Sequence, residues 1–128
     1  MKRERLILLT GMLLMAFSVA MGAFGAHAWK VKLAETGRTD TYELGIRYLM
    51  FHALALILLG LLIERFPRLF LAVVFLVLGI LFFSGSLMVL ALANEGRWGA
   101  VAPVGGTLLI LGWLTAAWTV YRSGKADH

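Results

Sequence analysis

The sequence predicts an all-α fold: an integral membrane four-helix bundle that runs up, down, up and down, with a short interfacial helix between the first and second spans. Composition is the first reason, because 61% of the 128 residues are hydrophobic and 15% are charged, against about 25% charged in soluble proteins. The mean hydropathy is +0.88. The second reason is that uncharged apolar runs occupy most of the chain, at residues 6–26, 48–63, 69–93 and 98–121.

Each apolar run is close to or above the length that a bilayer requires. A hydrocarbon core about 30 Å thick is crossed by roughly 20 helical residues. Flanking residues extend the expected helices to about 6–28, 41–63, 68–93 and 99–121, within a single transmembrane domain of residues 1–128. The longest polar stretch, residues 29–43, is one connection, so a soluble catalytic lobe is excluded.

The first run also resembles a secretory signal. Lys2, Arg3 and Arg5 precede it, and Ala26-His27-Ala28 has the small-x-small pattern of a cleavage site. Against cleavage, the uncharged run has 21 residues, whereas a signal core has about 7 to 15. We therefore expect this segment to remain as the first span.

The first connection is the only long one. Trp29 and Leu33, with lysines between them, predict a short amphipathic helix at the membrane interface, ended by Gly37. Asp40 and Glu43 resemble a capping box, which predicts that the second span starts there. The other connections are short, so consecutive spans are expected to be antiparallel neighbours.

The cations predict the orientation in the membrane. If both termini and the turn at 64–68 share one side, that side holds seven of the twelve Lys and Arg residues. The positive-inside rule then places both termini in the cytoplasm. The cations are scattered among helix ends rather than gathered on one face, which argues against nucleic acid as a partner. The expected partner is the lipid bilayer, with a homo-oligomer or a protein partner as further candidates.

No pattern of reactive residues indicates an enzyme. The chain has no cysteine, and we find no zinc-protease, nucleophile-elbow or phosphate-loop motif. No carboxylate lies inside an uncharged run. We therefore expect no catalytic residue and no metal site, and no cofactor is assigned.

Two histidines are the best polar candidates, because ionisable residues at membrane depth face the bundle interior or a wet cavity. Counting along the helices places His52, Ser86 and Thr107 in one layer, roughly 10 to 12 Å below the outer helix ends. This layer predicts a shallow pocket that opens outward. Its expected ligand-binding residues are His27, Arg47, His52, Ser84, Ser86 and Thr107.

The alternative interpretation of the same residues is that they only stabilise the fold. His52 could simply join helices by a hydrogen bond to a backbone carbonyl, Ser84 or Ser86. Burial requires it to face the bundle interior in either reading, with a polar partner on another helix. Arg47 is expected to pair with Glu43, one turn earlier, or with an outer-loop carbonyl.

Glycines inside the apolar runs predict close helix contacts. A glycine lowers helix propensity but lets a neighbouring helix approach. The packing positions that we expect are Gly22, Gly25, Gly85, Gly105 and Gly106.

Four segments, in this order and spacing, resemble a known family: residues 22–28; Tyr48 with residues 51–56; residues 83–87; and residues 103–106 with Gly112 and Trp113. They resemble domain-of-unknown-function family 423, small bacterial inner-membrane proteins related to eukaryotic transmembrane protein 256. The resemblance covers essentially the whole chain. It implies four membrane-spanning helices with the first one retained, and it brings no activity, substrate or catalytic residue.

Three functions follow as hypotheses. The leading one is a non-enzymatic protein that binds a lipid, a small ligand or a partner protein in the outer-half pocket near His52. The first alternative is a transporter or channel component that moves a proton, ion or small solute past His52, with Arg47 at the entrance. The second is haem or metal binding between His27 and His52, which two histidines alone support only weakly.

Overall fold

The computed structural model describes residues 2–126 and is almost wholly helical. The elements are α1 (Lys2–Ala26), α2 (Lys30–Thr36), α3 (Thr39–Leu62), α4 (Leu69–Ala93), the 3-10 helix η1 (Gly96–Ala100) and α5 (Ala102–Ala126). Four segments of the described chain are helical, long and apolar enough to cross a membrane. The predicted fold class is confirmed.

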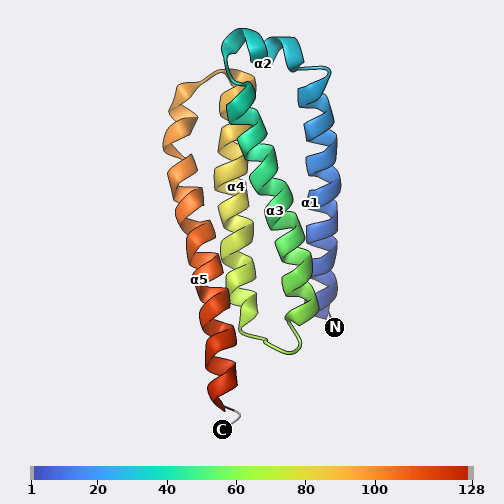
Figure 1. Cartoon of the computed structure of the whole chain (residues 1–128), viewed down its shortest axis with the longest axis vertical. Coiled ribbons are helices and arrows are strands. Elements are labelled where there is room, and N and C mark those ends of the chain that lie inside the picture. Colours follow the sequence, from blue (N-terminus) through green and yellow to red (C-terminus); the bar gives the residue numbers. More distant parts are fainter. Residues whose placement is uncertain (1, 127–128) are drawn as a thin grey trace.

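The four long helices form a row in which α1 packs against α3, α3 against α4, and α4 against α5 (Figure 1). Successive spans are antiparallel, so the described chain begins and ends at the same end of the bundle (Figure 1). We call this the terminal end; it also carries the α3–α4 turn. The short helix α2 lies across the opposite end, which we call the α2 end.

The structure corrects several helix boundaries. The first span begins at Lys2 and the last runs from Ala102 to Ala126. The capping-box prediction is wrong, because α3 begins at Thr39 and its N-cap residue, Arg38, makes no side-chain cap bond. The Arg38 carbonyl accepts the first helical N–H, from Tyr42, at 3.0 Å, so Asp40 lies inside the first turn.

The interfacial helix between the first two spans forms as predicted. Leu33 anchors α2 and is almost fully buried. Gly37 ends the helix with φ +68°, the left-handed conformation that glycine adopts without strain. Just beyond it, the Arg38 Nε donates to Asn94 Oδ1 at 3.1 Å, which links the first connection to the end of α4.

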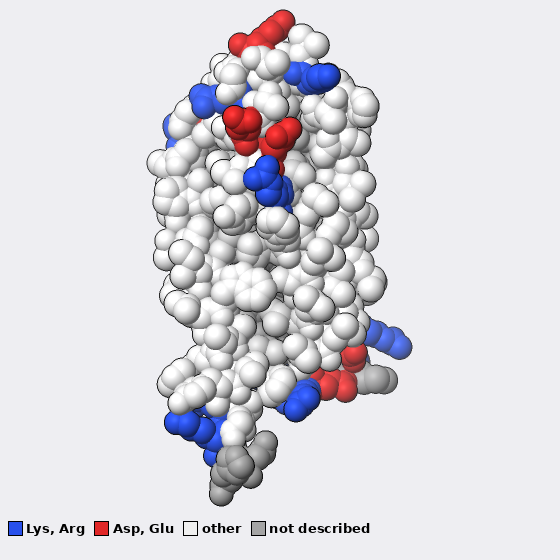
Figure 2. Space-filling view, viewed as in Figure 1, with Lys and Arg blue, Asp and Glu red and all other residues white. Residues whose placement is uncertain are grey.

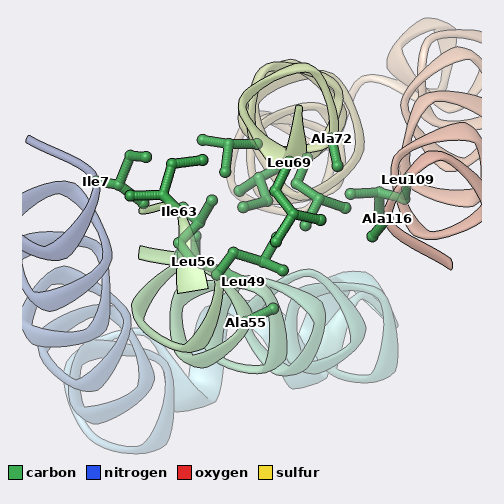
Figure 3. Packing of buried hydrophobic residues seen from close by; sticks show 13 residues of the cluster. Ile7, Leu49, Ala55, Leu56, Ile63, Leu69, Ala72, Leu109 and Ala116 are labelled. Atoms are coloured by element: carbon green, nitrogen blue, oxygen red, sulfur yellow. The ribbon is translucent and has the colours of Figure 1, made fainter. Parts of the chain in front are cut away.

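The main core lies between α3 and α4 (Figure 3). Leu56, Leu69 and Leu76 are fully buried there. Helix α1 adds Ile7, and α5 adds Leu109 and Ala116, at the edges of the cluster (Figure 3). The other faces of α1 and α5 expose large apolar side chains, as expected of helices whose outer faces meet lipid acyl chains.

Glycines bring the neighbouring helices into close contact at two of the predicted positions. A Cβ added at Gly105 would overlap the Phe83 backbone on α4, and one at Gly25 would overlap the Tyr42 ring on α3. At Gly22 and Gly106 the contact would be an ordinary one, at 3.7 Å. Gly85 does not fit the prediction, because a Cβ added there would meet no neighbouring atom within 4 Å. It points away from the neighbouring helices.

Candidate functional site

His52 is buried and is held by two hydrogen bonds. Its Nδ1 lies 2.7 Å from the Tyr48 carbonyl oxygen, one turn back on α3. Its Nε2 accepts the indole N–H of Trp113, on α5, at 3.1 Å. The prediction that His52 faces the interior, with a partner on another helix, is confirmed, but the partner is Trp113 rather than Ser84 or Ser86.

These two bonds define the protonation of the imidazole. An Nε2 that accepts a hydrogen bond carries no proton, so the proton sits on Nδ1 and is donated to the Tyr48 carbonyl. The ring is therefore neutral, and both nitrogens are occupied. A metal ion or a transported proton would have to break the bond to Trp113.

The predicted polar layer does not form. Gly45, not His52, faces Ser84 across the α3–α4 interface. A Cβ added at Gly45 would lie 3.3 Å from the Ser84 carbonyl oxygen. His52 lies seven residues further along α3, which is roughly 10 Å deeper. The helix count failed because α3 begins at Thr39, which puts His52 thirteen residues, or roughly 20 Å, below that end rather than about 12 Å.

The hydroxyls of the predicted layer have separate, local surroundings. Ser86 is buried and donates to the Phe83 carbonyl at 2.9 Å. Thr107 is exposed and donates to the Pro103 carbonyl, also at 2.9 Å. The buried Ser84 Oγ has no hydrogen-bond partner within residues 2–126. None of the three lines the groove described below.

The two histidines do not converge. His27 is exposed near the end of α1, beside Ala23 and Phe24. His52 points toward α5, which packs on the other side of the row from α1. Within residues 2–126, no three His, Cys, Asp or Glu residues are grouped so as to hold a metal ion. The geometry does not support a cofactor held between His27 and His52.

A groove of about 280 Å³ opens at the α2 end, between α1, α2 and α3. Its apolar lining includes Leu33, Ile46 and Met50, and Gly22, Gly25 and Ala26 form the α1 wall. Thr39, Tyr42, Glu43 and Arg47 supply the polar groups. Of the predicted ligand-binding residues, only Arg47 lines this groove.

Arg47 makes neither of its predicted contacts. Within residues 2–126, the structure shows no ion pair to Glu43 and no hydrogen bond from the guanidinium. The side chain is exposed, eight residues into α3, which is about 12 Å below the start of that helix. An unpaired cation at this depth favours an anionic partner, because charge interactions strengthen as water is excluded.

Two residues of the site were missed by sequence reasoning. Trp113 was noted only as part of a motif, although an indole N–H inside a membrane needs an acceptor, and a buried histidine is the natural one. Tyr42 is buried under Gly25, and its hydroxyl donates to the Met21 carbonyl. The burial of Tyr42 could have been predicted from a glycine on one helix that faces an aromatic residue on the next.

The described residues therefore define a multi-pass α-helical membrane protein with a groove at one end. Residues 21–106 match the family described as "Protein of unknown function (DUF423)". The chain belongs to this family. Its kinship with eukaryotic transmembrane protein 256 stays a prediction.

Similar proteins cover nearly the whole chain. A UPF0382 membrane protein of Staphylococcus haemolyticus is 40% identical over 111 residues, covering 86% of this chain and 90% of that protein. The UPF0382 inner membrane protein YgdD of Escherichia coli is 38% identical over 117 residues, covering 86% and 87%. A UPF0382 membrane protein of Haemophilus influenzae is 36% identical over 110 residues, covering 84% and 86%. No solved structure matches the chain significantly.

Proposed function

We propose that this inner-membrane protein binds an amphiphile with an acidic head group in the groove at the α2 end. The observation that carries the proposal is the Arg47 guanidinium, which lines the groove and has no partner within residues 2–126. Glu43 also lines the groove but makes no ion pair with Arg47 within residues 2–126, so a carboxylate or phosphate of the ligand would pair with the guanidinium. The hydrocarbon part would lie on Leu33, Ile46 and Met50.

The size and shape of the groove favour a small amphiphile. At about 280 Å³, it is close to the lower limit of roughly 300 Å³ for small-molecule pockets. The glycines of the α1 wall keep the groove open, because side chains at Gly22 and Gly25 would approach Ile46 and Tyr42. This site replaces the pocket expected near His52.

Transport past His52 is the weaker candidate. The imidazole is already engaged with Tyr48 and Trp113. Below it, toward the terminal end, fully buried leucines such as Leu56 and Leu76 fill the space between α3 and α4. Within residues 2–126, the buried polar side chains are Ser18, His52, Ser84 and Ser86. None of them lies on α3 or α4 between His52 and the terminal end, so these two helices offer no buried polar group to relay a proton or ion there.

The experiment uses full-length protein in a neutral detergent, with dodecanoate as the probe and dodecanol as the uncharged probe of the same chain length. Thermal unfolding is followed while each probe is titrated, because a ligand that binds only the folded state raises the melting temperature. The test variant is Arg47→Gln. Lys32→Gln is the matched control, because it removes a cation at the same end but outside the groove.

We expect dodecanoate to stabilise the wild type and Lys32→Gln saturably, and dodecanol to do so much less. Arg47→Gln should weaken dodecanoate binding by about tenfold or more, the usual value of a hydrogen bond to a charged group. Equal stabilisation of all three proteins by dodecanoate would overturn the proposal. So would equal stabilisation of the wild type by dodecanol.

A further inference from the structure

A second and larger cavity lies at the terminal end of the bundle. Its volume is about 870 Å³, within the range of roughly 300 to 1,000 Å³ for small-molecule sites. Parts of the chain far apart in sequence converge on it, namely α1, the α3–α4 turn, the start of α4 and the last turns of α5. Together they supply four arginines: Arg3, Arg65, Arg68 and Arg122.

Three of these arginines lie over aromatic rings rather than against carboxylates. The guanidinium carbon is 5.1 to 5.8 Å from the ring centroid in the pairs Arg3–Phe70, Arg65–Phe66 and Arg122–Trp118. All six residues line the cavity, and no carboxylate does. Stacking of this kind uses the face of the guanidinium and leaves its N–H groups free for an anion. Within residues 2–126, no ion pair or hydrogen bond engages the four guanidinium groups.

One face of α5 adds hydroxyl groups to the same cavity. Thr115, Thr119 and Ser123 recur every four residues, so they lie on one side of the helix. Ser123 donates to the Val120 carbonyl at 2.7 Å. The Thr115 and Thr119 side chains, which are partly buried, make no hydrogen bond within the described part of the chain. They can donate to oxygen atoms of a ligand.

The charge of this end is not balanced by the protein itself. Within residues 2–126, the terminal end carries seven Lys and Arg residues and two carboxylates, Glu4 and Glu64. The α2 end carries five cations and four carboxylates. Figure 2 shows the Lys and Arg atoms at the terminal end beside α5 and below the α3–α4 turn, with an uncharged band over the middle of the bundle. Four of the seven cations at this end line the cavity.

We propose that this cavity binds the phosphodiester head group of an anionic diacyl phospholipid. The arginines would hold the phosphate, because a guanidinium binds two phosphate oxygens at once. The hydroxyls of α5 would meet the glycerol and ester oxygens. The acyl chains would leave along Phe70 and Leu71, at the start of a membrane-spanning helix. Basic pockets between transmembrane helices are the usual sites for such head groups.

The arrangement is more specific than membrane orientation requires. Lysine serves the positive-inside rule as well as arginine does. In this cavity all four cations are arginines, and three are stacked on rings. A lysine keeps the charge but cannot bind two oxygens in one plane. Exchange of arginine for lysine therefore distinguishes two cases. Lipid binding should weaken if the arginines form a binding site, and it should not change if their charge only orients the protein.

The test uses the full-length protein in neutral detergent and dioctanoyl phosphatidylglycerol as the probe. Dioctanoyl phosphatidylcholine and inorganic phosphate are titrated in parallel, and binding is measured by thermal unfolding and by native mass spectrometry. The variants are Arg68→Lys/Arg122→Lys and Arg68→Gln/Arg122→Gln. Lys30→Gln/Lys32→Gln removes two cations at the α2 end as the matched control. All of these side chains are exposed, so the unfolding midpoints without lipid should agree.

We expect phosphatidylglycerol to bind the wild type and the Lys30→Gln/Lys32→Gln control alike. Affinity should fall at least tenfold in the double-lysine variant, because a lost charge-assisted hydrogen bond costs about that factor. It should fall further in the double-glutamine variant, which also loses both charges. Three outcomes would overturn the proposal: phosphatidylcholine binding as tightly as phosphatidylglycerol, inorganic phosphate stabilising the protein as much as the lipid does, or the double-lysine variant binding like the wild type. The Arg47→Gln variant should still bind phosphatidylglycerol. The proposal for this cavity can therefore fail or hold independently of the proposal for the groove at the α2 end.

Discussion

The indole of Trp113 donates a hydrogen bond to His52 Nε2 at 3.1 Å, and this bond joins α5 to α3 beside the intervening helix α4. His52 is near the middle of α3, where water is scarce, so each partner depends on the other for its hydrogen bond. The Tyr48 ring stacks on the imidazole and also contacts Phe83 on α4. His52 and Tyr48 together therefore link side chains of three helices, because His52 contacts α5 and Tyr48 contacts α4.

A double-mutant cycle should measure this bond. Exchange of His52 for leucine leaves the Trp113 N–H without an acceptor and should lower the free energy of unfolding by about 1 to 3 kcal/mol. Trp113→Phe removes the donor. The coupling energy between the two changes should be about 0.6 to 2 kcal/mol, the range found for hydrogen bonds between membrane helices. Denaturant unfolding in detergent micelles gives the free energies of unfolding of the wild type, the two single variants and the double variant.

His52→Asn is the control for this cycle, because an asparagine retains hydrogen-bonding groups at the position and should preserve much of the stability. A coupling energy near zero would show that the bond contributes nothing to the fold. Equal losses for the leucine and asparagine variants would show that the imidazole acts through its shape rather than its nitrogens.

Two glycines in neighbouring turns of adjacent helices should respond to alanine in opposite directions. At Gly105 the added methyl group would overlap the Phe83 backbone, so α4 and α5 must separate, at a cost of about 1 to 3 kcal/mol. At Gly85 there is open space, and the better helix propensity of alanine should stabilise by up to about 1 kcal/mol. Melting temperatures of the two variants, measured in the same detergent, check the difference. Similar melting temperatures would contradict the assigned contact.

The orientation of the bundle is testable with reporter fusions. Cations concentrate at the terminal end, so we expect both termini in the cytoplasm. A phosphatase fused at the C-terminus should be inactive, and the same enzyme fused after Gly37, in the first connection, should be active. The reverse result would place the four-arginine cavity in the outer leaflet. A mature N-terminus at Trp29 would instead show that the first span is cleaved.

The sequence by itself determined the number of spans, their antiparallel order and the short helix between the first two. These features follow from local properties: the length of each apolar run, the charges at its ends, the shortness of the later connections, and a glycine able to adopt φ +68° at residue 37. The resemblance to the family was read from motifs in the same way, and the family match agrees with it.

Only the tertiary structure decided which way each helix faces. A span that is apolar on every side, such as α4, has no polar stripe to indicate its rotation, and in lipid no contrast of hydrophobicity supplies one. The rotation follows instead from packing at glycines such as Gly105, and from the bond between His52 and Trp113. For this reason Thr107 and Gly85 were misplaced, Arg47 was paired wrongly, and the arginines of three separate segments were not seen to share one cavity.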